Sequence, residues 1–311
     1  MIALKNRFAI FILYLLFTSG GYAQGTFSNL YVFGDSMSDA GNLASLPEFE
    51  FLLESPYDEG FSNGPRAVEV LAGYLELSAD PSLYLIGPSV GTNYAVAGAR
   101  AAGDEVIDLK AQVARFIYDH TGSVPSDALY IIFIGGNDVR DARDEPDLKT
   151  ARSLVDHAAQ AIDQELRTLI ASGAEAILIV NAPDIGALPE THLIAEFLNN
   201  SNFILRATRL TEEFNRKLTR KVNKTERDFH IDLVQFDLFS SMDFLMENND
   251  ALGFTNISAA CFSSVTFTYD PECLDGEAFD QFMFFDEIHP TARVHERTGR
   301  ALYATIPEPA E

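Results

Sequence analysis

Apolar and polar residues alternate along the chain in blocks of two lengths. Short apolar runs predict strands at Leu30–Phe33, Thr92–Val96, Ala128–Ile134, Ala176–Val180 and Ile231–Phe236. Longer segments with helical spacing predict helices at Pro65–Leu77, Val106–His120, Thr150–Ser172, Phe203–Asn223 and Thr291–Tyr303. The third and fourth apolar runs are almost continuous, which is typical of strands covered on both faces.

Strands that alternate with helices favour an α/β fold, with a parallel sheet and helices on both of its faces. No Pro-, Ser- or Gly-rich linker divides residues 24–311, so we expect them to form one domain. Residues 240–285 show no clear period. We expect them to form a long ordered loop held by the two cysteines.

The N-terminus has the pattern of a secretory signal peptide. Lys5 and Arg7 precede the apolar run Phe8–Phe17, and small and polar residues follow, so residues 1–23 are predicted to be removed after Ala23. A membrane anchor is the alternative, but a spanning helix needs about 20 apolar residues. We therefore expect a secreted or periplasmic protein, with no integral membrane segment after signal cleavage.

The charge of the chain excludes several classes of partner. It has 311 residues, with 22 Lys and Arg against 46 Asp and Glu, and a formal net charge of −24. Nucleic acid and anionic lipid surfaces both attract basic proteins, so no nucleic-acid partner is expected. Hydrophobic residues make up 47% of the chain, which is too many for a disordered protein.

The only two cysteines are Cys261 and Cys273. In an exported protein such a pair predicts a structural disulfide. A cysteine nucleophile is less favoured, because neither residue sits at a strand-to-helix turn. A metal site would need more ligands than two cysteines.

Candidate catalytic residues gather where the predicted strands end. Ligands of parallel α/β sheets bind outside the carboxyl ends of the strands. Gly34–Ser36 follows the first strand, Ala97–Ala99 the second and Gly135–Asp138 the third, while Asp286 and His289 precede the last helix.

These residue types suit one reaction. A serine hydroxyl such as that of Ser36 needs a base to become a nucleophile. His289 can be that base, and Asp286 can accept its other ring N–H. The simpler alternatives are that Ser36 caps a following helix, and that Asp286 and His289 are N-terminal features of the last helix.

Acyl transfer also needs donors for the negative charge on the carbonyl oxygen. Asn137 offers a side-chain amide, Gly98 a backbone N–H that a substrate can approach closely, and Ser36 its own backbone N–H. Gly-Asn-Asp is common turn chemistry when it stands alone. Together, these features at successive strand ends point to a serine hydrolase.

The blocks that carry these residues are GDSMSD at 34–39, GTNYAVAGA at 91–99, GGND at 135–138 and DEIHPT at 286–291. With the lesser segments 61–65 and 180–186, they resemble the GDSL lipase/esterase family of the SGNH hydrolase superfamily, from about Leu30 to Leu302. Met37 replaces a usual Leu, and Ala97 stands where Gly is frequent. The pair Phe284-Phe285 stands where the family often has Phe-Trp.

The resemblance implies a fold and a set of roles. The fold is a flavodoxin-like three-layer sandwich, with a central parallel sheet of about five strands. Ser36 is implied as nucleophile, His289 as base and Asp286 as the residue that orients it. Ser36, Gly98 and Asn137 are implied as the oxyanion hole.

Other candidates are set aside. Gly87–Gly91 fits the G-x-S-x-G elbow around Ser89, but a β-like run follows where that elbow needs a helix. The remaining histidines lack the grouping of a metal site, so structural or surface roles are expected for them. No cofactor or metal is invoked, and activity is expected to be insensitive to EDTA. These histidines are His120, His157, His192, His230 and His295.

The sequence thus predicts a secreted serine esterase or lipase that hydrolyses carboxylic esters through an acyl-enzyme on Ser36. Lipid, short-chain and sugar esters all fit the same residues as substrates. One alternative is an acyltransferase with the same triad. Another is a non-catalytic surface or carbohydrate-binding protein on a hydrolase scaffold.

Overall fold

A computed structural model describes residues 27–306 of the chain, so the predicted signal peptide lies outside the described residues. The centre of the fold is a parallel sheet in the order β1-β2-β3-β4. In register, Leu30 stands beside Leu129, and Leu129 beside Ala176. Every residue of β1 and β2 is buried, as their continuous apolar sequences require. The strands are β1 (Leu30–Gly34), β2 (Leu129–Phe133), β3 (Ala176–Val180) and β4 (Val234–Phe236).

The predicted strand at Thr92–Val96 is present only as an irregular segment beside β1. Tyr94 N donates to the carbonyl of Val32 at 2.8 Å, and Asn93 forms isolated bridges with Val32 and Pro81. The pairing is interrupted at Gly34, because its N–H donates to the side chain of Gln112 at 2.9 Å, although its carbonyl still accepts the N–H of Val96 at 3.2 Å. The sheet therefore has four regular strands where about five were expected. With this segment added, the spatial order is that of a flavodoxin-like sheet.

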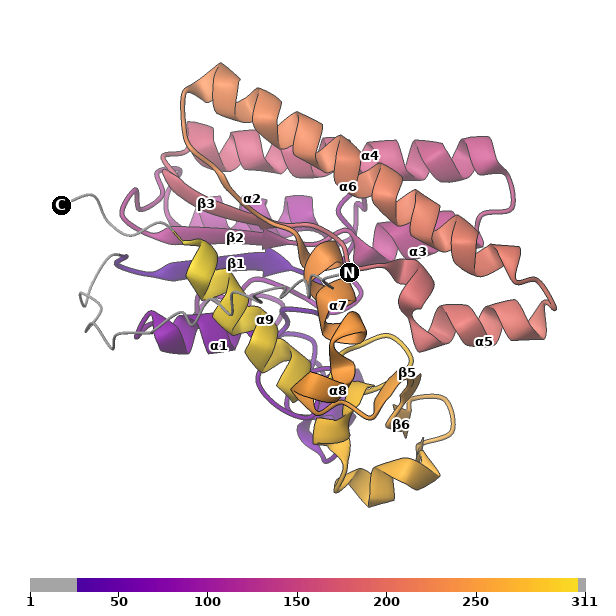
Figure 1. The fold of residues 1–311 in the computed structure, drawn as a ribbon. Helices are drawn as coiled ribbons and strands as arrows, with labels where there is room; N and C mark the ends of the chain where they lie inside the picture. Colours follow the sequence, from indigo (N-terminus) through magenta and orange to yellow (C-terminus); the bar gives the residue numbers. More distant parts are fainter. Residues whose placement is uncertain (1–26, 307–311) are drawn as a thin grey trace, which may run out of the picture.

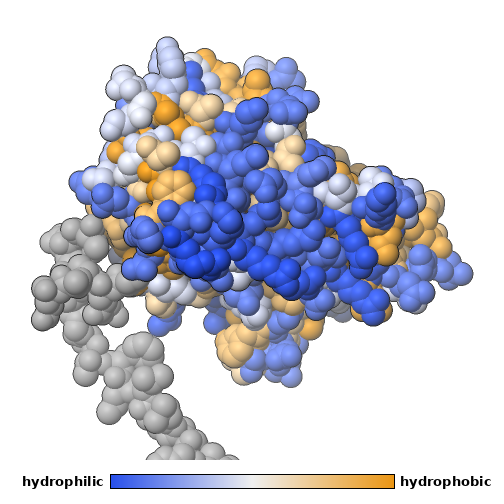
Figure 2. Space-filling model, turned by 90° about the horizontal axis from the view of Figure 1, so that it is seen from above, coloured by the Kyte–Doolittle hydropathy of each residue, from blue (hydrophilic) through white to orange (hydrophobic). Residues whose placement is uncertain are grey.

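Helices cover both faces of the sheet (Figure 1), which confirms the predicted α/β fold class. On one face α1 packs against α9, and on the other α4 packs against both α2 and α6. In α6 the buried side chains recur every three or four residues, from Phe203 to Val222, so one stripe faces the core. Seen from above, the outer surface of the helix layer that contains α4 and α6 is largely hydrophilic (Figure 2). These helices are α1 (Ala67–Tyr74), α2 (Leu109–Asp119), α4 (Leu148–Ala171), α6 (Asn202–Phe229) and α9 (Ala292–Thr305).

The apolar pattern of the sequence does not predict the two short helices that follow β2 and β3. The helix α3 (Gly136–Asp144) follows β2, and α5 (Pro189–Phe197) follows β3 after the short 3-10 turn η2 (Ile185–Ala187). Both helices have only nine residues, and α3 is rich in charged residues. A further 3-10 turn, η1 (Pro47–Leu53), lies between β1 and α1.

Residues 240–285 are not a loop, which corrects the prediction. Their β5 pairs with β8 in parallel, and β6 pairs with β7 in antiparallel. These elements are too short to show a period in the sequence. In chain order they are α7 (Leu238–Glu247), α8 (Asn249–Leu252), β5 (Asn256–Ala260), β6 (Phe262–Ser263), β7 (Thr268–Tyr269), η3 (Pro271–Gly276), η4 (Phe279–Gln281) and β8 (Phe282–Phe284).

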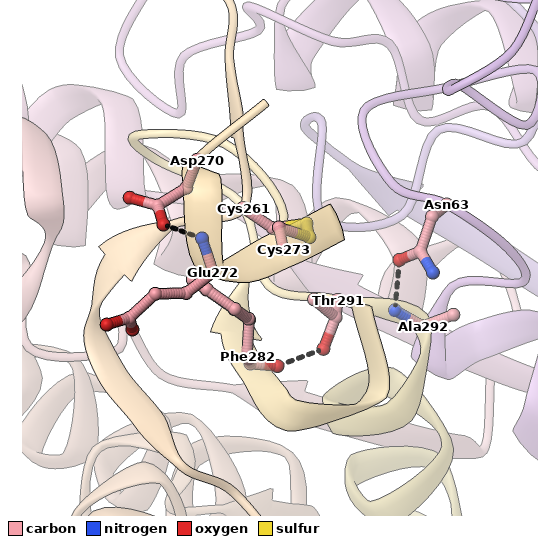
Figure 3. The surroundings of a disulfide bond; sticks show 8 residues. All are labelled: Asn63, Cys261, Asp270, Glu272, Cys273, Phe282, Thr291 and Ala292. Atoms are coloured by element: carbon pink, nitrogen blue, oxygen red, sulfur yellow. Dashed lines mark hydrogen bonds between the residues drawn. A yellow bond between two sulfur atoms is a disulfide. The ribbon is translucent and has the colours of Figure 1, made fainter. Parts of the chain in front are cut away.

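The predicted disulfide between Cys261 and Cys273 is confirmed in the structure, with the two Cα atoms 5.3 Å apart. Both cysteines are fully buried and pack with Phe282. Figure 3 shows the bridge beside the chain at Thr291, whose hydroxyl donates to the carbonyl of Phe282. Within residues 27–306, no helix combines the length and apolar character needed to cross a membrane.

Candidate active site

Ser36 lies in a tight turn directly after β1. The backbone N–H groups of Ser38 and Asp39 both donate to the carbonyl of Asp35. The turn begins at Gly34, where a Cβ would lie 2.6 Å from the carbonyl oxygen of Phe133 on β2. Only glycine allows β1 and β2 to approach so closely there. The chain makes one turn and no helix follows at once, so Ser36 does not cap one.

His289 joins Ser36 to Asp286. Its Nε2 lies 2.8 Å from Ser36 Oγ, and its Nδ1 lies 2.8 and 2.9 Å from the two oxygens of Asp286. The three residues are 9%, 5% and 1% exposed, in the order Ser36, His289 and Asp286. Because the carboxylate holds a proton on Nδ1, Nε2 is left free to accept the serine proton.

The loop that carries Asp286 and His289 is stabilised by hydrogen bonds within it. The Oδ1 atom of Asp286 accepts backbone N–H groups from Ile288 at 2.8 Å and from His289 at 2.7 Å. These bonds fix the carboxylate relative to the backbone of the residue that it orients. The structure thus brings together the three residues that the sequence proposed as a triad.

A distant segment, residues 61–63, braces the same loop. The ring of Phe61 stacks on the imidazole of His289, with centroids 4.9 Å apart. Ser62 Oγ donates to the carbonyl of Pro290 at 3.1 Å. The side chain of Asn63 accepts the backbone N–H of Ala292 at 2.9 Å, and Figure 3 shows this bond at the start of α9.

Asn137 and Gly98 come from two neighbouring segments, the start of a helix and a loop. Asn137 lies in the first turn of α3, and its Nδ2 donates to the carbonyl of Ala99 at 2.9 Å. Gly98 precedes Ala99 and has φ +85°, a conformation that favours glycine. The bond between Asn137 and Ala99 therefore joins the two segments that carry predicted oxyanion donors.

Ser36, Asn137 and His289 line one pocket, and Gly98 lies outside its lining. Most of the other lining side chains are apolar, among them Ile185 and Leu188. The remaining lining residues are Asp35, Met37, Phe133, Ile134, Gly136, Arg140, Asn181, Ala182, Pro183 and Ile288.

A buried polar network holds the turn of Ser36, and sequence reasoning missed it. The carboxylate of Asp39 accepts backbone N–H groups from Gly41, Asn42, Leu43 and Ala97, at 2.7 to 3.1 Å. The side chain of Asn42 donates to the carbonyls of Asn93 and Ala95, both at 2.8 Å. The turn after β1 is thereby locked to the segment that leads to Gly98. This bonding pattern gives each short polar side chain several backbone partners, and nothing in the sequence marks it.

Two buried carboxyl groups beside the site titrate unusually. Burial raises the pKa of Asp35 to about 6, although the N–H of Met37 and the charge of His289 oppose the rise. Burial likewise raises the pKa of Asp138 to about 6. The Asp138 carboxylate accepts the N–H groups of Ala101 and Ala102, so it supports the loop that follows Gly98.

Ser89, the serine of the G-x-S-x-G motif, is hydrogen-bonded to side chains of α2. Ser89 Oγ donates to Asp119 at 2.5 Å, and it accepts from Arg115 at 3.4 Å. Among the remaining histidines, His295 is buried and its Nδ1 accepts the N–H of Ala67, while burial lowers its pKa to about 3. Residues 27–306 contain no group of three or more His, Cys, Asp or Glu that could hold a metal ion.

Comparison with known proteins adds a family. A family model described as GDSL-like Lipase/Acylhydrolase matches residues 30–302. Lipase 1 of Photorhabdus luminescens is 29% identical over 181 residues, covering 55% of this chain and 24% of that protein. An Arabidopsis thaliana protein named inactive GDSL esterase/lipase-like protein 25 is 24% identical over 338 residues, covering 99% of this chain and 78% of that one. Phosphatidylcholine-sterol acyltransferase of Aeromonas hydrophila is 31% identical over 174 residues, covering 54% and 48%.

Proposed function

Because the chain belongs to the GDSL-like lipase/acylhydrolase family, within the SGNH hydrolases, we propose that it is a serine esterase. It hydrolyses carboxylic esters through an acyl-enzyme on Ser36. One observation carries the proposal: Ser36 Oγ, both ring nitrogens of His289 and the Asp286 carboxylate form a continuous hydrogen-bonded chain, and Ser36 and His289 line a pocket.

The proposed reaction has two halves. Ser36 Oγ forms a bond to the ester carbonyl carbon while its proton passes to His289 Nε2. The oxyanion is held by the Asn137 amide and by the backbone N–H groups of Gly98 and Ser36. When the C–O bond to the alcohol breaks, His289 returns the proton to the alcohol oxygen. Water then attacks the acyl-enzyme in the same way and releases the acid. Asp286 stabilises the imidazolium in both halves.

Transfer of the acyl group to another alcohol is the second candidate. It uses the same acyl-enzyme and differs only in the acceptor, and the likeness to a phosphatidylcholine-sterol acyltransferase supports it. Added alcohol acceptors decide between the two reactions. If they divert the acyl group to a new ester at low concentration, the chain is a transferase.

A non-catalytic role is the rival from another class, since a relative that covers 99% of this chain is named inactive. The contacts of Ser36 with His289 argue against it here. Labelling by a fluorophosphonate tests this directly, because only an activated serine reacts. Labelling of the wild type that Ser36→Ala loses supports catalysis, and an unlabelled wild type supports the inert scaffold.

The decisive experiment is hydrolysis of p-nitrophenyl esters, from acetate to palmitate. We expect Ser36→Ala to lose all but a few per cent of the activity. Ser89→Ala is the matched control, because that serine lies in the competing motif and is bonded to Asp119. Hydrolysis that survives in Ser36→Ala would contradict the proposal. The preferred chain length then separates lipid esters from short-chain esters, and sugar esters are tested as acetylated oligosaccharides.

We further propose that residues 1–23 are a cleaved signal peptide, that residues 24–311 form one domain, and that the mature protein is secreted or periplasmic. The disulfide supports an oxidising compartment. N-terminal sequencing of the protein recovered from outside the cytoplasm should begin at Gln24. A start at Met1 in a soluble cytoplasmic fraction would contradict the proposal.

A further inference from the structure

The side-chain amide of Asn137 is held at both ends. Its Nδ2 donates to the carbonyl of Ala99 at 2.9 Å, and its Oδ1 accepts from Arg140 Nη1 at 3.0 Å. A backbone carbonyl can only accept and a guanidinium can only donate, so a flipped amide would lose both bonds. The second Nδ2–H has no share in either bond and remains for a ligand in the pocket.

Arg140 is in turn held by Glu190, at the start of α5. The Nε and Nη2 atoms of Arg140 lie 2.9 and 2.5 Å from the two carboxylate oxygens. This two-pronged pairing fixes the plane of the guanidinium. The direction of its third nitrogen, Nη1, is therefore set, and that nitrogen meets Asn137.

Glu190 has partners of its own. The almost fully buried Arg143 donates from Nη1 to Glu190 Oε2 at 2.8 Å. The backbone N–H of Glu190 donates to the carbonyl of Glu287, next to Asp286, at 2.8 Å. Burial alone would raise the pKa of Glu190, but hydrogen bonds and charge from Arg140 and Arg143 outweigh it and lower the pKa. The carboxylate thus stays ionised at neutral pH.

We propose that Arg140, aimed by Glu190, is a positioning residue for the oxyanion donor Asn137. This inference rests on the proposed function, in which Asn137 stabilises the oxyanion. Arg140 keeps the free Nδ2–H directed into the pocket. The hydrogen bond from the guanidinium to the amide oxygen also polarises the amide and strengthens the N–H as a donor. Because the other two nitrogens of Arg140 are paired with Glu190, Arg140 acts through Asn137 and does not bind an anionic part of the substrate.

The test is a double-mutant cycle on ester hydrolysis. Loss of Asn137 itself, in Asn137→Ala, should lower kcat by about 10²–10³-fold. Since Arg140 acts through Asn137, Arg140→Met should lower kcat by less, about 10-fold, and leave KM within about 2-fold. In the Asn137→Ala background, Arg140→Met should change kcat by less than about 2-fold. Equal losses in the two backgrounds would overturn the inference, and so would an unchanged kcat in Arg140→Met alone.

A second measurement follows the side-chain amide of Asn137 independently of catalysis. In NMR spectra, the side-chain N–H signals of Asn137 should exchange with water faster in Arg140→Met than in the wild type, and Arg140→Lys should restore part of the protection. If exchange is unchanged, Arg140 does not hold the amide.

Further variants cover the case in which Arg140→Met fails to fold. Arg140→Lys keeps the charge but not the fork, and Glu190→Gln keeps the shape of the carboxylate. Both should lower kcat by several-fold, and only when Asn137 is present. Arg152→Met removes an arginine that pairs with Glu213 on the surface, and should leave kcat unchanged.

The same data separate this inference from the proposed function. If Ser36→Ala retains hydrolysis, the proposed function fails. If hydrolysis depends on Ser36 while the two losses add independently, the role of Arg140 alone fails.

Discussion

The two sides of the candidate site are held in different ways. The nucleophile side, residues 34–43 with 92–99, is tied to the central sheet through buried polar side chains, above all Asp39 and its four backbone donors. The base side, residues 256–292, depends on short strand pairs, a disulfide and packed aromatic rings. Both sides present a side chain to the same pocket.

Stability of the domain and placement of His289 therefore depend on different parts of the candidate site. The nucleophile side is part of the core of the domain, so damage there should unfold the molecule. The base side joins that core through Met283 and Phe284, and its other buried residues form two smaller clusters beside it. Substitutions on the base side should first displace His289 and leave the central sheet folded.

The largest effect is expected for His289→Ala. Loss of the base should lower kcat for a p-nitrophenyl ester by about 10⁴-fold or more, because the serine proton then has no acceptor. Thermal unfolding should show that the sheet is intact. The control is His157→Ala, which removes an exposed histidine of α4. Activity near the wild-type level in His289→Ala would remove this residue from the proposed mechanism.

Asp39→Ala should act on folding instead. It leaves four buried N–H donors without their acceptor, and we expect the free energy of unfolding to fall by about 3–5 kcal/mol. Urea denaturation followed by circular dichroism measures the loss. Asp250→Ala, at an exposed position of α8, should change stability by less than about 0.5 kcal/mol. If Asp39→Ala is as stable as this control, the nucleophile side does not depend on the network.

Removal of the disulfide tests the base side. The double variant Cys261→Ser, Cys273→Ser should lose about 3 kcal/mol of unfolding free energy, because the loop between the cysteines is no longer closed in the unfolded chain. Backbone N–H groups of Cys261 and Phe262 donate to the carbonyls of Phe284 and Phe285. Loss of the disulfide should displace the backbone at Cys261, and these bonds pass the displacement on to Phe285, the residue before Asp286. We therefore expect kcat to fall as well, by several-fold.

The readout for that variant is steady-state hydrolysis below its melting temperature. The wild type in the same buffer is the control for temperature. If the variant melts earlier but keeps full kcat, the disulfide stabilises the fold without positioning the base.

The smallest effect concerns the pH dependence of stability. The raised pKa of Asp35, about 6, means that the folded protein binds a proton between about pH 4 and 6 that the unfolded chain has released. The free energy of unfolding must therefore fall as pH rises through this window. In Asp35→Asn this contribution is absent.

Between about pH 4.5 and 7.5, wild type should lose roughly 2 kcal/mol more of unfolding free energy than Asp35→Asn. Urea titrations of both proteins at several pH values measure the difference. Asp138, whose pKa is raised in the same way, is present in both proteins, and its charge is only a minor cause of the raised pKa of Asp35, so its own contribution largely cancels. Parallel curves for the two proteins would contradict the raised pKa.

The sequence indicates the fold class and the principal side chains of the site, because both leave local marks. Apolar runs locate the strands, and strand ends locate Ser36 and Asn137. The strand expected at Thr92–Val96 is irregular because Gln112, from a helix, takes the N–H of Gly34. That contact joins residues 78 positions apart, and hydropathy does not record it.

The same reason explains what sequence reasoning missed at the site. Arg140 meets Glu190 across 50 positions, and Phe61 meets His289 across more than 200. Charged residues on a short helix normally face solvent, so the pattern gave Arg140 no special status. The elements between 240 and 285 are two to ten residues long, and their packing is decided by tertiary contacts.

The hydrogen bond between Ser36 and His289 spans 253 positions of the chain. The proposed nucleophile is therefore synthesised well before its proposed base, which comes just ahead of the helix α9 that packs on α1. A chain still emerging from the ribosome carries Ser36 before His289 has been made. In the proposed mechanism the serine thus becomes reactive only after these two distant segments have met, and copies truncated before His289 are expected to be inactive.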